Sequence, residues 1–403
     1  MKETLQKPKV LVLSRAGTGL ATIRALAVGG AQITAAVFKK SEPVRYSFCC
    51  DVIDLSKIDT DQELMDWLIS HGKQQVEPLV LIASSDEHAL LLAKNREQLK
   101  SYYLMWQNDH PTLTQIINKN RLYLLAEKVG VPVIPAINEP SLEEVTTWAA
   151  SNPAPYFIKP FYEGNRECKL TKKNLVLASE DELIDYVKNN GAQALIIQRL
   201  IQGGDGYIFD TYGLCDEKGE LITIASHRRW RQYPPDRGTT SFGEIPGTQD
   251  AAAEALMFEQ TQRLLSSIKY HGIFGIEWLL DKNTGVYYVI DFNARPFTSV
   301  GHLHACGLNL PLLAYQDLVG ENLSHVEIEP QLRHKYWIDL LLDLWSLQDK
   351  LDARTISIRA WLKTILRCRS CAYCSWKDPG PGFYRSLIII KLLIDKAWKN
   401  VAE

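Results

Sequence analysis

The sequence predicts a multidomain protein that combines α/β and α+β classes. We expect a parallel α/β N-terminal domain at 1–110, a mixed second unit at 111–320 and a mostly helical C-terminal extension at 321–403. Three observations lead to this division: the length, the alternation of strand and helix patterns, and a change of composition after residue 320. With 403 residues, and about 150 residues per domain, two to three domains are expected. A hydrophobic fraction of 46% with 23% charged residues is typical of globular chains.

Residues 9–110 alternate between apolar strand patterns and helical periodicity. The predicted strands are 9–14, 32–38, 50–55 and 78–83, and the predicted helices are 20–28, 61–70 and 86–99. Strands that alternate with helices in this way favour a parallel sheet covered on both faces. Gly17 and Gly19 follow the first strand and predict a tight turn. A dinucleotide site is not favoured there, because the third glycine is missing and Lys39-Lys40 replaces the expected acidic residue.

The second unit begins after His110-Pro111. Its predicted helices are 113–129 and 141–150, and its predicted strands are 156–159, 194–198, 207–215 and 221–225. Beyond Gly320 the chain becomes rich in Trp, Leu and basic residues, which favours helices.

Charge and composition exclude several classes of protein. The chain has 45 Lys and Arg against 47 Asp and Glu, so no nucleic-acid partner is expected. The densest apolar run, Leu387–Ile394, is too short to span a bilayer, and no secretion signal is recognisable at the N-terminus. Eight cysteines without a paired framework suit a reducing compartment, so we expect a cytoplasmic protein.

The most informative segment is 272–296, GIFGIEWLLDKNTGVYYVIDFNARP. Two apolar strands flank a turn at 282–285, which predicts a β-hairpin. With this turn, Glu277 lies opposite residue 290, give or take one, and therefore beside Asp291. Because side chains alternate along a strand, Asp291, Asn293 and Arg295 share one face.

This face is suited to a divalent cation beneath phosphate groups. Carboxylate and amide oxygens are ligands that a hard dication prefers, and a guanidinium can hold a phosphate through two hydrogen bonds. The alternative is a simple ion pair between Glu277 and Arg295 on a solvated sheet face. Two lysines favour the phosphate site: Lys119 begins a helix, and Lys159 ends a strand before a proline, where it can project into a cleft.

Six motifs in order resemble the ATP-grasp superfamily of ATP-dependent ligases, over roughly residues 110–320. They are NKNRLYLLAEKVGVP, FIKP, LIIQRLIQGG, GIEW, VIDFNARP and ACGLNLP. No P-loop pattern occurs. The resemblance implies a two-lobed ATP-grasp domain at 111–320, preceded by the N-terminal domain of matching kind.

The resemblance also implies roles for individual residues. Lys119 and Lys159 resemble the pair that holds the nucleotide phosphates. Arg295 resembles the arginine that steadies the transferred phosphoryl group, and with Lys159 it is the predicted catalytic residue. The adenine-reading segment is Gln198, Arg199, Leu200 and Ile201, with Asp205 on the ribose. The magnesium ligands are Glu277, Asp291 and Asn293. The family's glycine-rich loop corresponds to 161–170, which has only Gly164.

The implied activity is an ATP-dependent, ADP-forming carboxylate-amine ligation through an acyl phosphate. The cofactors would be ATP and Mg²⁺, with Mn²⁺ as a substitute, and the partners a small carboxylic acid and an amine, such as an amino acid or small peptide. Alternatives are a carboxylase-type or thiol-directed enzyme of the same fold, and a regulatory ATP-binding protein without turnover. A homo-oligomer is compatible with the sequence.

Three features remain open. The segment 227–241 concentrates arginines, of which Arg228 and Arg231 are candidates for binding an anionic substrate; a solvated basic loop is the alternative. Cys368, Cys371 and Cys374 have a metal-like spacing but lack a fourth ligand, so a buried stripe on a helix is favoured. The tail at 384–401 could lie on a membrane surface or on a partner, and packing on its own protein is favoured.

Overall fold

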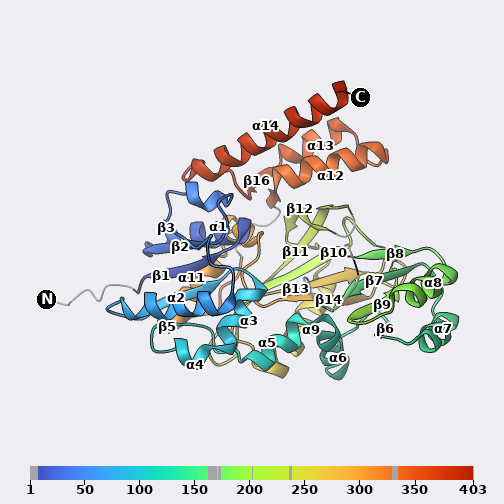
Figure 1. Ribbon diagram of the computed structural model, residues 1–403, viewed down its shortest axis with the longest axis horizontal. Helices are drawn as coiled ribbons and strands as arrows, with labels where there is room; N and C mark the ends of the chain where they lie inside the picture. Colours follow the sequence, from blue (N-terminus) through green and yellow to red (C-terminus); the bar gives the residue numbers. More distant parts are fainter. Residues whose placement is uncertain are drawn as a thin grey trace.

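The computed structural model describes residues 8–161, 170, 174–201, 203–235, 238–328 and 335–402. Three sheets organise the described residues, and Figure 1 shows the first of them beside the other two, with a layer of C-terminal helices above. The predicted combination of α/β and α+β architecture is confirmed. The predicted domain boundaries remain predictions.

The first sheet is parallel and five-stranded, in the order β3-β2-β1-β4-β5. Its strands are β1 (Val10–Ser14), β2 (Ile33–Val37), β3 (Asp51–Asp54), β4 (Leu79–Ala83) and β5 (Tyr103–Leu104). The connecting helices are α1 (Ala16–Ala27), η1 (Pro43–Tyr46), α2 (Asp61–Lys73), α3 (Asp86–Lys94) and α4 (Arg96–Leu99). Alternate residues of β1 enter different cores: Val10 and Val12 pack with α1, and Leu11 and Leu13 with α2 and α3. The sheet is therefore covered on both faces, as the apolar strand patterns predict.

The second sheet is antiparallel and four-stranded, in the order β6-β9-β7-β8. Its strands are β6 (Ala136–Asn138), β7 (Tyr156–Pro160), β8 (Leu175–Leu177) and β9 (Leu195–Arg199). Helices α7 (Leu142–Ser151) and α8 (Glu180–Asn190) share a core with this sheet. Helices α5 (His110–Ile117) and α6 (Lys119–Lys128) precede it.

The third sheet has seven strands in the order β14-β13-β10-β11-β12-β15-β16. They are β10 (Ile208–Cys215), β11 (Leu221–Tyr233), β12 (Thr239–Ile245), β13 (Gly272–Leu280), β14 (Tyr287–Asn293), β15 (Lys335–Ile338) and β16 (Cys368–Cys371). Only the β15–β16 pair is parallel. Three helices contact strands of this sheet: α9 (Ala251–Ile268), α10 (Val300–Ala305) and α11 (Leu310–Leu318).

The C-terminal extension adds helices α12 (Leu340–Asp352), α13 (Ile358–Ile365) and α14 (Pro379–Ala402). Asp343 of α12 anchors it, because this buried carboxylate accepts hydrogen bonds from Arg231 Nε (2.8 Å), Ser241 Oγ (2.9 Å) and Trp361 Nε1 (2.7 Å). The extension is thus tied to β11 and β12 of the large sheet. Among the described residues, no helix is both long and apolar enough to cross a membrane.

Three local predictions are wrong. The turn expected at Gly17 and Gly19 is the first part of α1, where a Cβ on residue 19 would lie 2.1 Å from Ser14 Oγ, so glycine permits close packing rather than a turn. The helix expected at 113–129 is broken at Asn118, whose side chain caps α6. The cysteines do not form a helical stripe, because Cys368 and Cys371 lie in β16, where pairing with β15 overrides the helical spacing.

Candidate active site

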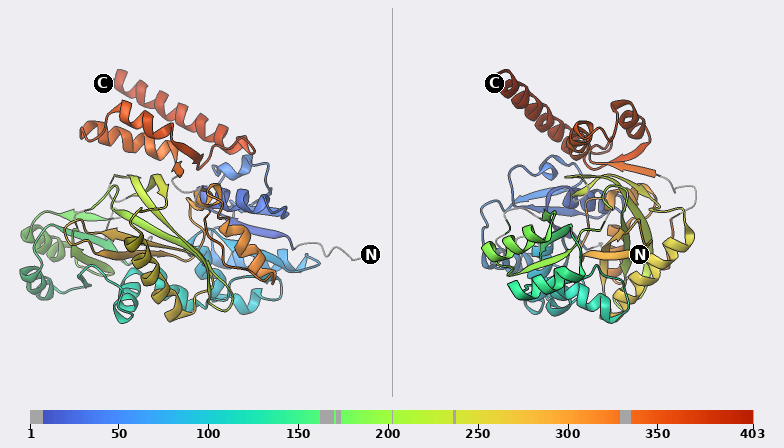
Figure 2. Two further views of the ribbon diagram at one scale, coloured as in Figure 1. Left: turned by 180° about the vertical axis from the view of Figure 1, so that it is seen from behind. Right: turned by 90° about the vertical axis from the view of Figure 1, so that its right-hand side faces the viewer.

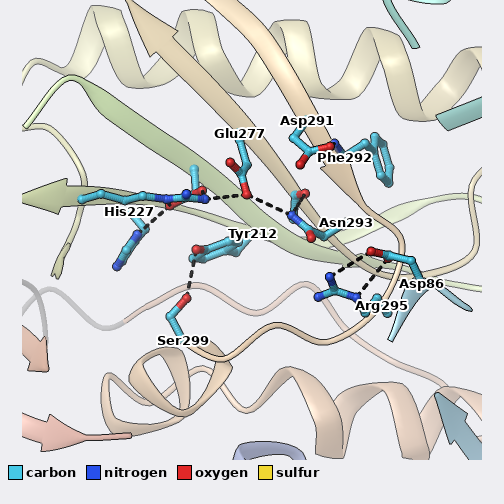
Figure 3. A network of polar contacts seen from close by, with 12 residues as sticks. Asp86, Tyr212, His227, Glu277, Asp291, Phe292, Asn293, Arg295 and Ser299 are labelled. Carbon is cyan, nitrogen blue, oxygen red and sulfur yellow. Dashed lines mark hydrogen bonds and ion pairs between the residues drawn. The ribbon is translucent and has the colours of Figure 1, made fainter. Parts of the chain in front are cut away.

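The hairpin of β13 and β14 has the predicted register. Glu277 pairs with Asp291, and Gly275 pairs with Asn293. The turn is closed by Gly285, which has a φ of +73° and donates its N–H to the carbonyl of Asp281 at 2.8 Å. Asn293 Nδ2 lies 3.2 Å from Glu277 Oε1, and Figure 3 shows these side chains on one side of the hairpin with Asp291 beside them. The predicted group of two carboxylates and an amide is therefore present.

Two lysines approach these carboxylates from a different part of the chain. The backbone N–H of Lys119, the first residue of α6, donates to the carbonyl of Phe161 at 2.8 Å, which ties the start of α6 to the end of β7. The Lys119 ammonium lies 2.9 Å from Asp291 Oδ1. Lys159, in β7, is buried and donates to the hydroxyl of Tyr123. Two lysines separated by 40 residues thus face the hairpin together.

Lys159 is electrostatically unusual. Burial, assisted by the nearby charge of Lys119, lowers its pKa to about 7, although Asp291 and Glu277 act in the opposite direction. An anion that binds beside this lysine would therefore favour its protonated, positively charged form. Burial also raises the pKa of its hydrogen-bond partner Tyr123, so that phenol is neutral.

A buried cluster behind Glu277 was not predicted from the sequence. Asp210 of β10 lies 3.0 Å from Arg229 Nε and 2.8 Å from His227 Nδ1, and all three side chains are buried. Arg229 also lies 2.7 Å from Glu277 Oε1. Although burial opposes ionisation, Arg229 and His227 lower the pKa of Asp210 to about 2. This cluster fixes Arg229, and Arg229 in turn holds one oxygen of Glu277.

Arg295 follows β14 and is held by helix α3, which connects strands of the first sheet. Its guanidinium lies 3.0 Å from both carboxylate oxygens of Asp86, the first residue of α3, as Figure 3 shows. The contact joins the hairpin to α3, one of the helices of the first sheet, and fixes the position of the guanidinium.

These side chains line one large cleft, with a volume of about 1210 Å³. The predicted residues that line it are Lys119, Lys159, Gln198, Leu200, Ile201, Glu277, Asp291, Asn293 and Arg295. The part of the chain that forms the first sheet contributes further groups, among them Arg15, Lys39 and His88. Burial lowers the pKa of His88 to about 4, so this imidazole is neutral at physiological pH.

Other predicted residues make contacts elsewhere. A bulge at Trp230 interrupts the pairing of β11 with β12, so Arg229 points to Glu277 whereas Arg231 binds the buried Asp343. Arg228 stacks on Trp230, with the guanidinium carbon 3.9 Å from the ring centre. The carboxylate of Asp205 lies 2.9 Å from Lys350. It is Arg229, rather than Arg228 or Arg231, that reaches the cleft wall.

Arg199 is the last residue of β9, and it is not among the described residues that line the cleft. Most of the loop 161–170 lies outside the described residues.

The hairpin residues fit a divalent metal by their donor chemistry. Glu277 and Asp291 supply anionic oxygens toward the cleft, and rotation of the Asn293 amide would turn its oxygen to the side now held by its nitrogen. Among the described residues, no three His, Cys, Asp or Glu side chains form a metal-binding group. Two carboxylates and one amide therefore suit an ion whose remaining ligands are phosphate and water, as Mg²⁺ prefers.

Comparison with known proteins places the fold. No protein-family model matches the chain. The chain is 20% identical over 298 residues to D-aspartate ligase from Enterococcus faecium. The aligned region covers 69% of this chain and 68% of that protein. It is similar in structure to N5-carboxyaminoimidazole synthetase from Staphylococcus aureus, with a TM-score of 0.64, 15% identity and 88% of each chain covered. It is also similar to the biotin carboxylase domain of 2-oxoglutarate carboxylase from Hydrogenobacter thermophilus, crystallised with MgADP, ADP and bicarbonate. That match has a TM-score of 0.62, 17% identity, and coverage of 81% of this chain and 73% of that one. The resemblance to the ATP-grasp superfamily is thereby confirmed, and the chain has the ATP-grasp fold.

Proposed function

We propose that the protein is an ATP-dependent, ADP-forming ligase that joins a small carboxylic acid to an amine through an acyl phosphate. The observation that carries this proposal is the meeting, in one cleft, of Lys119 and Lys159 with Glu277 and Asp291. Ammonium groups beside carboxylates are what a magnesium–triphosphate complex needs for charge balance. The similarity to a D-aspartate ligase supports the same class of reaction.

The nucleotide would lie between the second and third sheets. Lys119 and Lys159 would hold phosphate oxygens, and the segment 198–201 at the end of β9 would meet the adenine. The N–H of Leu200 is already bonded to the carbonyl of Pro155 at 2.8 Å, which holds this segment against the start of β7. We keep Asp205 as a candidate for the ribose.

Glu277, Asp291 and Asn293 would hold Mg²⁺, with Mn²⁺ as a substitute. The ion would neutralise charge on the phosphates during transfer. Arg229 restrains Glu277 from behind, so this carboxylate is oriented before any ligand arrives. Lys119 now occupies one oxygen of Asp291 and would move to a phosphate when the nucleotide binds.

In the first step, a carboxylate oxygen of the substrate attacks the γ-phosphorus of ATP. The bond to the β-phosphate oxygen breaks, and ADP leaves. In the second step, an amine attacks the acyl carbon, phosphate leaves with the bonding electron pair, and the amine nitrogen loses a proton to give the amide. Arg295 would steady the migrating phosphoryl group, and Asp86 holds its guanidinium at the domain boundary.

The acid substrate would occupy the part of the cleft near the N-terminal domain. Arg15 and Lys39 line that part and can attract a carboxylate. We retain Arg228 and Arg231 as weaker candidates, because Arg231 is committed to Asp343. Because the reaction consumes ATP, we propose that it takes place in the cytoplasm.

The test is to measure ADP release over a panel of amino acids, including D-aspartate, other small organic acids and bicarbonate, each with and without an amine. Hydroxylamine is added to trap an acyl phosphate as a hydroxamate. Substrate-dependent ADP together with a hydroxamate supports the proposal. Release of AMP and pyrophosphate contradicts it.

A second candidate is a carboxylase-type reaction, favoured by the structural similarity to the carboxylase domain crystallised with bicarbonate. In that case ADP release requires bicarbonate, and an added organic acid does not replace it. An ATP-binding regulatory protein would bind nucleotide but release no ADP with any member of the panel.

A further inference from the structure

The C-terminal extension exposes apolar side chains in a regular pattern. In α14, Phe383, Leu387, Ile390 and Ile394 are between 49% and 68% exposed. They are separated by four, three and four residues, a spacing that places them along one side of a helix. Over the part whose side chains the structure describes, helix α14 therefore exposes an apolar stripe.

The neighbouring helix repeats the pattern. In α13, Ile358 and Leu362 are about half exposed and Leu366, just beyond the helix, is 84% exposed; they follow one another at intervals of four residues. The opposite side of α13 faces inward, because Trp361 is buried and donates to Asp343. Trp376, between β16 and α14, is fully exposed. We call this set of exposed apolar residues on α13, α14 and Trp376 the C-terminal apolar surface.

The surface is carried on a firmly attached layer. Asp343 anchors α12 and α13 to the large sheet, and Asp378 anchors the start of α14 by binding Arg24 Nε at 2.8 Å. Tyr384 stacks on Tyr46 of η1, with ring centres 4.3 Å apart. Figures 1 and 2 show the three helices as a layer at one end of the molecule, with α14 outermost. The exposed residues therefore belong to an ordered structure.

Charge distinguishes this segment from the rest of the chain. From Arg354 to Glu403 there are ten basic and three acidic residues, a formal charge of +7, whereas the whole chain carries −2. One of the three acidic residues, Asp378, is buried in the contact with Arg24. Exposed cations directly follow exposed apolar residues in the sequence, namely Arg359, Lys363, Arg367, Lys377 and Lys391. The surface thus combines apolar stripes with positive borders.

This combination fits an anionic phospholipid bilayer. Amphipathic helices with basic borders lie in the interface plane, where the apolar side enters the acyl region and the cations meet lipid phosphates. A second copy of the same surface fits poorly, because two segments of +7 would repel each other. Nucleic acid would meet the cations but leave the apolar side chains in water.

We propose that the C-terminal apolar surface docks the protein reversibly on an anionic bilayer, with the cleft of the ATP-grasp fold left open to the aqueous side. The proposal does not depend on the ligase activity, because it concerns residues outside the cleft.

The test is cosedimentation of the full chain with lipid vesicles, without nucleotide. Vesicles of equal parts phosphatidylglycerol and phosphatidylcholine should carry the protein into the pellet, and vesicles of phosphatidylcholine alone should carry much less. Raising the salt concentration from 0.1 M to 0.5 M should release most of it, as screening predicts. Equal binding to both vesicles, or binding to neither, would overturn the proposal.

Two variants locate the contact. Leu362→Gln combined with Leu387→Gln should abolish binding, and Arg359→Gln combined with Lys363→Gln should weaken it about 25-fold, since each cation near an anionic surface contributes roughly a factor of five. Leu256→Gln, on the exposed side of α9, is the matched control and should bind normally. Circular dichroism and the thermal midpoint verify folding of each variant.

Sedimentation velocity over a range of protein concentrations tests the alternative that a second copy of the chain covers this surface. If the wild type does not bind vesicles but forms a dimer that the Leu362 and Leu387 variant abolishes, the surface is an interface between copies and the proposal is overturned. Normal vesicle binding by that variant also overturns it.

Discussion

Nucleotide binding should be coupled to proton uptake by Lys159. Its ammonium is buried beside Lys119, and burial lowers its pKa to about 7. A triphosphate bound against it would favour the charged form and raise the pKa. Above pH 7, the free protein must therefore take up a proton when ATP binds.

The size of the effect follows from the pKa. If the pKa is about 7, then about nine-tenths of the Lys159 side chains are neutral at pH 8, so roughly 0.9 proton enters per nucleotide. Because only the charged form binds well, the affinity should fall about tenfold from pH 8 to pH 9. Stability should change in the opposite sense over this range: the unfolded chain, with a lysine pKa of about 10.4, binds more protons, so the free energy of unfolding rises with pH.

Isothermal titration calorimetry with a non-hydrolysable ATP analogue and Mg²⁺ measures both quantities. Comparison of two buffers with different ionisation enthalpies gives the number of protons taken up. Lys159→Gln should bind more weakly and without proton uptake, and Lys128→Gln, at the exposed end of α6, should behave as the wild type. No proton uptake at pH 8, or the same uptake in Lys159→Gln, would refute the reasoning.

Three further substitutions test the site and its supports. Glu277→Gln removes an anionic ligand of the proposed metal, so turnover should fall at least about 100-fold with an unchanged circular dichroism spectrum; activity within tenfold of wild type would remove the metal assignment. Asp210→Asn leaves the buried Arg229 without its main counter-charge and should lower the free energy of unfolding in urea by about 3–5 kcal/mol, whereas a loss below about 1 kcal/mol would show that the cluster is not structurally important. Asp343→Asn should weaken the attachment of the C-terminal helices by a similar amount and accelerate amide hydrogen exchange at 340–366; unchanged exchange would contradict its role as the anchor.

The hairpin could be predicted because its information is local. Its register depends on a turn with Asn and Gly and on the alternation of side chains, both readable within about 25 residues. The start of α6 at Lys119 and the strand position of Lys159 are likewise local features. Their meeting with the hairpin came only from the resemblance to a known family.

The cluster behind Glu277 could not be predicted in the same way. Asp210 meets Arg229 and Glu277 because β10 pairs with both β11 and β13. The sequence of a single segment does not determine which strands pair with one another. The signal in the sequence was Asp210, the single charged residue of the strand segment IFDTYG, which indicates a buried charge that needs a partner.

The arginines of β11 illustrate a different limit. Strict alternation places Arg229 and Arg231 on the same face, but the bulge at Trp230 separates them. The prediction for the cysteine run was wrong for a related reason. A spacing of three residues suits a helix, but long-range pairing with β15 makes this segment a strand. Bulges and long-range strand pairs depend on the tertiary structure.

The most direct test of the central claim is a crystal structure with MgADP bound. The account predicts the phosphates between Lys119 and Lys159, and the metal ion in contact with Glu277 and Asp291. Phosphates found elsewhere, with the two carboxylates directed only toward Arg229 and Lys119, would contradict it.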